Sequence, residues 1–289
     1  MLDLMNTSFV VVGIVKDSAD NLREDVLRIS KCLEGAKSLK WFIVESNSTD
    51  NTLGILLDLS KAFSNFDFIS LGQKSNFQNL RTVTLAEARN IYLSEIKNNA
   101  KYIDTDYVVV MDFNGLNNKI SKESIESCFE NDLWDVCTAN QSGPYYDIWA
   151  LRHELWSPND CWESHRFFRQ YMKSPEKALF TSLHSRMITI SQNSRWIEVD
   201  SAFGGMAIYK KNVFIHGIYS GLNDSGLPIC EHVPFHNKIK ENNYKIFINP
   251  KFINTNKTDH SKQFSIGAKI RRKILYPIKL LKFDNSHDE

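Results

Sequence analysis

The chain has 289 residues, which is the size of one large domain or two small ones. Hydrophobic residues make up 42% and charged residues 24% of it, an ordinary globular composition that argues against a disordered chain. With 35 basic and 34 acidic residues the formal net charge is +1, which argues against a nucleic-acid-binding protein. The balance is uneven, because residues 261–289 carry a net charge of +4 and the remainder −3.

Neither a disulfide framework nor a zinc knuckle is indicated, because the 5 cysteines are scattered and none forms a C-x-x-C pair. A reducing compartment fits this pattern. The apolar run 9–15 is too short for a membrane span or for a signal segment. We therefore expect a cytoplasmic protein, either free or bound peripherally to the inner face of a membrane.

Strand and helix patterns alternate through the first half of the chain. The predicted strands are 9–15, 41–45, 66–71 and 107–111, and the predicted helices are 21–33, 53–63 and 85–97. The strands are continuous apolar runs, which is typical of parallel strands covered by helices on both faces. This alternation predicts a doubly wound α/β unit.

The second half is less regular. Residues 140–195 are rich in aromatic and polar residues and contain at most two short helices. Beyond them the pattern predicts strands at 196–200, 206–210 and 244–248 and a helix at 231–243.

Carboxylates follow three of the predicted strands, namely Asp17, Glu45 and Asp112. Ligands of such sheets bind beyond the carboxyl ends of the strands. Several acids there suit a divalent cation and ligand hydroxyls better than a bare phosphate. Asp112 and Asn114 offer two oxygen ligands for Mg²⁺ or Mn²⁺, although Asp-x-Asn is also an ordinary turn sequence. No glycine-rich phosphate-binding loop follows any strand.

Six segments, in the same order, resemble motifs of GT-A fold glycosyltransferases of family 2. They are residues 11–17, 44–52 (VESNSTDNT), 85–90 (LAEARN), 109–114 (VVMDFN), 204–210 (GGMAIYK), and 231–235 (EHVPF) with 243–246 (NYKI). Residues 145–152 (YYDIWALR) also resemble capsule-associated mannosyltransferase-like proteins, which share the fold class. Together the segments cover about residues 8–250.

The resemblance implies an α/β fold of GT-A type, a doubly wound mixed sheet with helices on both faces. Residues 1–138 would be the nucleotide-sugar half and 139–255 the acceptor half of one domain, followed by a basic amphipathic tail, 256–289. The implied activity is that of a metal-dependent hexosyltransferase. Such an enzyme moves a sugar from a UDP- or GDP-linked donor to a hydroxyl of a glycan or lipid-linked acceptor in surface polysaccharide synthesis.

The resemblance also assigns roles to individual residues. On the donor side, Asp112 and Asn114 would hold Mn²⁺ or Mg²⁺, and the nucleotide-sugar would be bound by Asp17, Glu45, Arg89 and Asp112. On the acceptor side, the sugar would be bound by Trp149, Arg152, Gly204 and Gly205. Each of these residues also has an ordinary structural alternative, such as an exposed helix arginine for Arg89 or a core position for Trp149.

Two departures from the family pattern concern the catalytic residues. The metal motif ends in Asn114 where the family carries a second acid, so one ligand would be a neutral amide. The family's Glu-Asp pair is Glu231-His232 here, and either residue is a candidate general base. The stereochemistry, inverting or retaining, stays open. His236 lies four residues after His232, and we expect it to be an ordinary hydrogen-bonded histidine.

Two other functions compete with the transferase interpretation. A sugar nucleotidyltransferase shares a similar sheet but normally has a glycine-rich loop after the first strand. A non-catalytic carbohydrate-binding relative would account for the two missing acids. Residues 266–289 combine isoleucine and leucine with lysine and arginine, which predicts either contact with an anionic membrane or a terminal helix docked on the acidic body.

Overall fold

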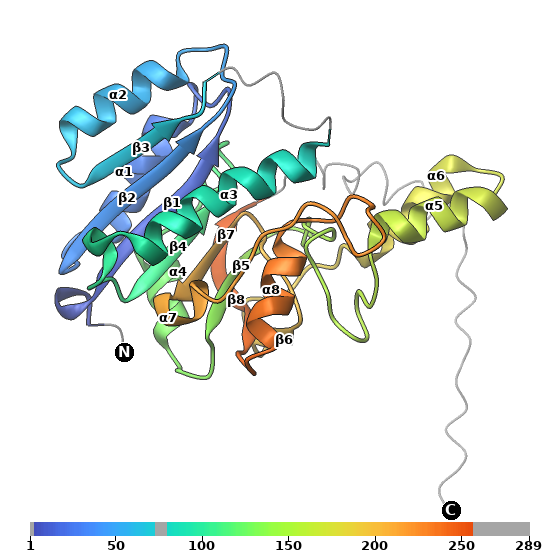
Figure 1. Ribbon diagram of the computed structural model, residues 1–289. Helices are drawn as coiled ribbons and strands as arrows, with labels where there is room; N and C mark the ends of the chain where they lie inside the picture. Colours follow the sequence, from blue (N-terminus) through green and yellow to red (C-terminus); the bar gives the residue numbers. More distant parts are fainter. Residues whose placement is uncertain (1–2, 73–79, 257–289) are drawn as a thin grey trace, which may run out of the picture.

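A single mixed sheet forms the centre of the computed structural model, which describes residues 3–72 and 80–256 (Figure 1). Within these residues the sheet has 8 strands in the order β3-β2-β1-β4-β7-β5-β8-β6. β1 to β4 are mutually parallel, while β7 is antiparallel to both of its neighbours and β6 is antiparallel to β8. The strands are β1 (Ser8–Val15), β2 (Ser38–Glu45), β3 (Phe66–Ser70), β4 (Tyr107–Met111), β5 (Val136–Gln141), β6 (Ile197–Val199), β7 (Met206–Lys210) and β8 (Ile246–Thr255).

Helices cover both faces of the sheet because alternate side chains of each strand point to opposite sides. Phe9 and Val11 of β1 join the core under one set of helices, whereas Val10 and Val12 join the core on the other face. The first face carries α1 (Leu22–Cys32), α2 (Thr52–Ala62) and α4 (Lys122–Glu126), and the second carries α3 (Arg81–Asn98), α7 (Lys211–Phe214) and α8 (His232–Lys240).

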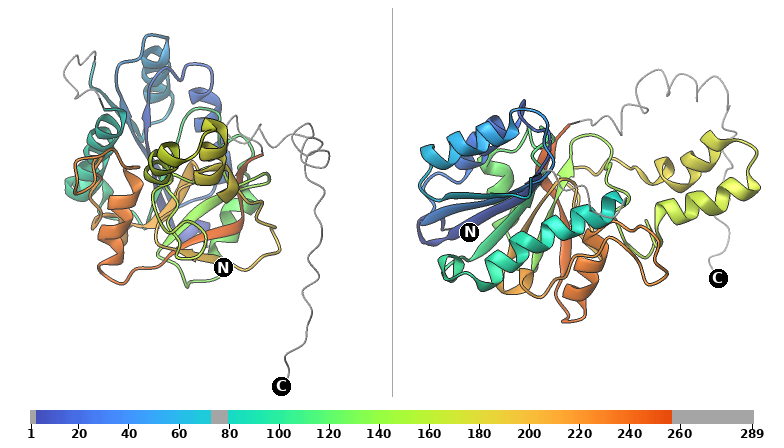
Figure 2. Two further views of the ribbon diagram at one scale, coloured as in Figure 1. Left: turned by 90° about the vertical axis from the view of Figure 1, so that its right-hand side faces the viewer. Right: turned by 45° about the horizontal axis from the view of Figure 1, so that its top comes forward.

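The remaining helical segments are one pair of helices and several single turns. α5 (Cys161–Tyr171) and α6 (Pro175–Ser182) project together beyond the end of the sheet (Figures 1 and 2). Single 3₁₀ turns lie at Leu4–Asn6, Ala100–Tyr102, Ser127–Phe129 and His184–Arg186. Two short helices in the aromatic region 140–195 agree with the sequence pattern.

This architecture confirms the predicted fold class, a GT-A-type mixed sheet with helices on both faces. The strands predicted at 107–111 and 206–210 have the bounds of β4 and β7. α8 ends at Lys240 rather than at residue 243, because Asn243 takes a left-handed conformation with φ 63° that stops a helix.

β5 was not predicted, and it crosses residue 138, where the sequence pattern divided the two halves. Its last two residues are Asn140 and Gln141, both fully buried although they are polar. Asn140 donates to the carbonyl of Pro250 at 3.0 Å, and Gln141 donates to that of Gly204 at 3.2 Å. These bonds satisfy the two amide nitrogens, while the amide oxygens of both side chains are buried without a partner among the described residues. The sequence alone shows only a polar stretch.

The basic tail predicted for residues 256–289 lies outside the described residues, apart from Asn256, and so does the membrane contact predicted for 266–289. Across the described ranges, none of the helices combines the length and the apolar character that a membrane crossing requires.

Candidate active site

A cavity of about 800 Å³ opens at the carboxyl ends of β1, β2 and β4. Its walls come from the first half of α3, the loop at 146–149 and the start of α8. Among the lining residues are six that the sequence predicted for the site, namely Arg89, Asp112, Asn114, Trp149, Glu231 and His232. Segments far apart in the chain therefore meet at one place, the edge where ligands of α/β sheets bind.

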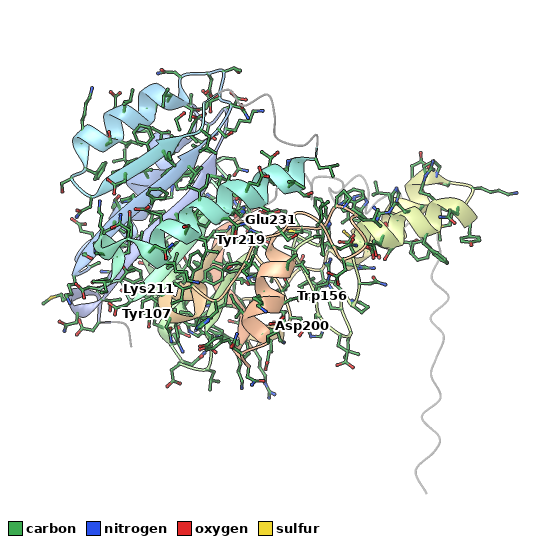
Figure 3. All side chains as sticks on the ribbon, in the orientation of Figure 1. Tyr107, Trp156, Asp200, Lys211, Tyr219 and Glu231 are labelled. Carbon is green, nitrogen blue, oxygen red and sulfur yellow. The ribbon has the colours of Figure 1, made fainter. Side chains whose placement is uncertain are left out.

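Arg89 links the two sides of this cavity. Its Nε donates to Glu231 Oε1 at 2.9 Å, and its Nη2 donates to Asp112 Oδ1 at 3.4 Å. Nη1 donates to the hydroxyl of Tyr92 at 3.0 Å, and the guanidinium lies 5.9 Å from the ring centroid of Tyr219. Glu231 and Tyr219 lie beside α3 in Figure 3. Arg89 is buried, which rules out an exposed helix arginine, and it bonds to the acid that follows β4 and to the acid that precedes α8.

Asp112 is the carboxylate best placed for a cation. It follows β4 directly, lines the cavity and has a side chain that is 29% exposed. Burial raises its pKa and the charge of Glu231 adds to this, while Arg89 acts in the opposite direction. Asn114, two residues on, also lines the cavity, and its Oδ1 accepts a hydrogen bond from the backbone N–H of Leu116 at 3.2 Å.

These residues fit a cation that is shared with a ligand. In the parts of the chain that the structure describes, His, Cys, Asp and Glu side chains form no group of three or more that could hold a metal ion. Mg²⁺ is usually held by one or two carboxylates, with phosphate oxygens and water completing its shell. Asp112 and the side-chain oxygen of Asn114, two residues further on, meet that requirement. A cation site made entirely of protein ligands is not needed.

His232 brings two unpaired nitrogens to the cavity wall. Its ring is 2% exposed and stacks on the ring of Phe203 with centroids 3.9 Å apart. Neither ring nitrogen has a hydrogen-bond partner among the described residues, and Nε2 lies 3.9 Å from Glu231 Oε1. Burial lowers the pKa of His232 well below its ordinary value, and the charge of Arg89 lowers it further, so the ring is neutral at pH 7. Unpaired buried nitrogens cost free energy, which a ligand could recover by bonding to them.

His236 has a structural role, as the sequence analysis expected. Its two ring nitrogens lie 2.9 Å from the hydroxyls of Ser201 and Tyr209, and burial lowers its pKa to about 3. The two histidines of α8 therefore differ in what they offer, because only His232 has bonding capacity left.

Asp147 is a site residue that the sequence analysis did not select. It lines the cavity, and its Oδ2 accepts a hydrogen bond from the N–H of Gly204 at 2.9 Å. Burial raises its pKa to about 6, and the charges of Asp112 and Glu231 add to this effect. The segment 145–152 had been singled out for its resemblance, but Asp147 ends no strand and so lacked the signal that marked the other acids.

Gly204 and Gly205 support the cavity wall from behind, and neither lines the cavity. Both have positive φ, 69° and 87°, which favours glycine. A Cβ on Gly204 would lie 2.7 Å from the carbonyl oxygen of Ala139, and one on Gly205 would lie 2.7 Å from the hydroxyl of Tyr146. The close approach is to protein atoms, and the pair fixes the start of β7 and the position of Asp147.

Trp149 lines the cavity, whereas Arg152 holds it in place. The indole Nε1 of Trp149 donates to Asp160 Oδ2 at 2.9 Å, and Arg152 Nη2 donates to the same oxygen at 2.8 Å. Arg152 Nη1 also donates to the carbonyl of Trp149 at 2.9 Å. Asp160 in turn caps α5, so the orientation of the tryptophan is tied to that helix.

Asp17 and Glu45 hold the loop between β2 and α2. Oδ1 of the exposed Asp17 accepts from the backbone N–H of Thr49 at 2.7 Å, a bond that lowers its pKa. Glu45 is 3% exposed, and its carboxylate accepts from the N–H of Ser48 at 2.9 Å and from the hydroxyl of Ser70. Neither carboxylate lines the cavity, but residues on each side of them do, among them Lys16, Ser18, Val44 and Ser46.

Of the comparisons with known proteins, only the comparison with solved structures found similar chains. No protein-family model matches the chain, and no curated protein matches it. A solved chain of S. aureus TarS, residues 1–349, is 16% identical, with 84% of this chain and 58% of that chain covered at a TM-score of 0.45. Mannosyltransferase PcManGT from Pyrobaculum calidifontis, solved with GDP-Man and Mn²⁺, is 12% identical over 86% of this chain and 56% of its own, at a TM-score of 0.47.

A third similar structure is glucosyl-3-phosphoglycerate synthase from Mycobacterium tuberculosis, solved with UDP. It is 12% identical, with 86% of this chain and 69% of that protein covered, at a TM-score of 0.42. The chain thus spans less than two thirds of the TarS and PcManGT chains. At these identities the likeness concerns the fold alone, and the function proposed below depends on the residues of the cavity.

Proposed function

We propose that this chain is a metal-dependent hexosyltransferase. It would move a sugar from a UDP- or GDP-linked donor to a hydroxyl of a glycan or lipid-linked acceptor in surface polysaccharide synthesis. The observation that carries the proposal is the Arg89 bridge, which joins Asp112 at the end of β4 to Glu231 at the start of α8 across one cavity. This bridge supports the proposal because an acid that would hold a cation and an acid that would take a proton are held at one cavity.

On the donor side, Asp112 and Asn114 would hold Mn²⁺ or Mg²⁺ together with the diphosphate. The bound ion would stabilise the charge that develops on the leaving nucleoside diphosphate. Asp17 and Glu45 are proposed to act on the nucleoside through the loop they hold, since Ser46 of that loop lines the cavity. They are positioning residues in this scheme.

On the acceptor side, Glu231 would take the proton of the acceptor hydroxyl as its oxygen attacks the donor sugar in an inverting reaction. Arg89 holds one of its oxygens, Oε1, and so fixes the carboxylate. The neutral His232 would bond to the substrate with a free ring nitrogen, and Asp147 would bind an acceptor hydroxyl. Trp149 would offer its ring to a sugar, in the orientation set by Asp160.

Calorimetry with UDP and GDP, with and without Mn²⁺, followed by a donor-hydrolysis screen, tests this proposal. Asp112→Asn should lower metal-dependent turnover by about 10²–10³-fold, the size of effect seen when one charge-stabilising group is removed from an active site. Asp58→Asn, a change at an exposed acid of α2, is the matched control and should leave turnover unchanged. Full activity of Asp112→Asn would contradict the metal assignment.

The same measurements separate the two competing functions. Carbohydrate binding without any nucleotide binding would favour a non-catalytic carbohydrate-binding protein. Release of diphosphate from a nucleoside triphosphate and a sugar phosphate would favour a nucleotidyltransferase.

A further inference from the structure

The pair α5 and α6 forms a projection whose surface the active site does not use. Figures 1 and 2 show the two helices side by side, extending away from the sheet. In α5 only Cys161 is buried, and in α6 only Ala178 and Ser182 are. We refer to residues 161–182 as the α5–α6 hairpin.

The hairpin exposes two aromatic rings on one face of α5. Phe167 is 56% exposed and Tyr171 is 72% exposed. They are four residues apart, so they share a helix face, and their ring centroids lie 5.0 Å apart. Exposed aromatic rings that lie side by side on a projecting helix are candidates for an interaction site.

Basic side chains lie along the same helix and just beyond it. Arg166 and Arg169 of α5 and Lys173, two residues after the end of α5, are all exposed. With Lys177 of α6 the hairpin has four basic residues against two acids, Glu163 and Glu176. Because the chain as a whole carries only +1, this positive charge is a local feature. A partner with a negatively charged surface would complement this positive charge.

From these observations we propose that the α5–α6 hairpin binds the interface of an anionic lipid bilayer. Aromatic rings insert at the boundary between headgroups and acyl chains, while arginine and lysine attract anionic headgroups. The hairpin projects outward from the body, so both kinds of side chain can reach a flat surface at the same time. The surface therefore fits a deformable partner into which it can insert.

The hairpin is also coupled to the cavity. Asp160, which caps α5, accepts hydrogen bonds from Trp149 and from Arg152, and Trp149 lines the cavity. The rings of Trp149 and Trp162 contact each other edge to face at 6.4 Å. Bilayer contact through the hairpin would thus set the orientation of the cavity relative to the lipid surface. The binding itself does not depend on the proposed transferase activity.

Vesicle sedimentation of the full-length chain tests the proposal, with phosphatidylcholine vesicles compared with mixed phosphatidylcholine and phosphatidylglycerol vesicles. The wild-type chain should pellet with the mixed vesicles. Phe167→Ser combined with Tyr171→Ser should lower the partition coefficient by about tenfold, and Arg166→Glu combined with Arg169→Glu should do so as well. The matched control is Leu53→Ser with Leu57→Ser, which removes an exposed apolar pair, 42% and 46% exposed, from α2. It should change the partition coefficient less than twofold.

Three results would overturn the proposal. One is a wild-type chain that does not pellet with the mixed vesicles. Another is equal pelleting of the wild type and both hairpin variants, which would assign membrane binding to another part of the chain. The third is a dimer in solution that the Phe167 and Tyr171 changes abolish without changing pelleting, which would make the aromatic face a contact between two copies of the chain. Thermal melting of each variant verifies that its fold is intact.

Discussion

Arg89→Met is expected to destabilise the folded chain by about 3–5 kcal/mol, the usual cost of removing one partner from a buried ion pair. The Arg89 side chain is 4% exposed, and Glu231, at 2.9 Å from its Nε, is 6% exposed. Asp112 is 29% exposed, so water compensates part of its loss. Most of the cost should therefore come from the Glu231 carboxylate, which the change leaves buried without a counter-charge.

Urea denaturation of the single and double variants measures this cost. Arg89→Met combined with Glu231→Gln should recover about 2 kcal/mol or more of the loss, because the second change removes the unpaired charge. Arg23→Met breaks an exposed ion pair with Asp58, whose side chains are 47% and 62% exposed, and should cost less than about 1 kcal/mol. A loss below about 1 kcal/mol for Arg89→Met, or no recovery in the double variant, would refute the reasoning.

Other predictions concern residues of the cavity and its supports. The pKa of Asp147 is raised from 3.8 to about 6, so folding favours its protonated form and stability falls as the pH rises between these values. Asp147→Asn should thus gain up to about 3 kcal/mol over the wild type between pH 4 and pH 7, and a constant difference in urea midpoint would contradict this. Gly205→Ala combines φ 87° with a hydroxyl oxygen 2.7 Å from the new Cβ and should cost about 2–3 kcal/mol, whereas Gly226→Ala has φ 73° in open space and should cost about 1. Equal melting temperatures for the two alanine variants would contradict the predicted difference in cost. His232→Phe should stay within about 1 kcal/mol of the wild type, while His236→Phe should lose about 2–4 because two buried hydroxyls lose their partners. Similar urea midpoints for the two variants would argue against unpaired nitrogens on His232.

The sheet was largely predictable because its strands and helices have local signals. Residues 9–15 and 107–111 are continuous apolar runs, which parallel strands between two layers of helices require. The helix predicted at 85–97 follows from apolar side chains that recur every three or four residues. In α3 the face that these side chains form is buried. The parts that failed were those with a mixed signal, such as the polar end of β5, whose burial depends on bonds to residues far along the chain.

The candidate site was also predictable only in part: the sequence indicated several of its residues and none of the contacts between them. Asp112, Arg89 and Glu231 could each be selected from the sequence, because each belongs to a short segment with its own pattern. Their contact could not, since Arg89 lies 23 residues from Asp112 and 142 from Glu231, and only the packing of α3 and α8 against β4 brings them together. Asp147 was missed because its position depends on Gly204, which lies 57 residues further along the chain, just before β7.

The chain sequence by itself determined the four parallel strands of the first half, the three helices between them and the acids that follow these strands. It also showed two opposite local charges behind the net +1. The tertiary structure decided which of these side chains face the cavity and which hold it from behind. Asp17 and Glu45 follow or end strands as Asp112 does, yet their carboxylates bond to the loop between β2 and α2, whereas Asp112 faces the cavity. A side chain's direction depends on the partners that folding brings within hydrogen-bond distance, and some of these partners, such as Thr49 for Asp17, are distant in sequence.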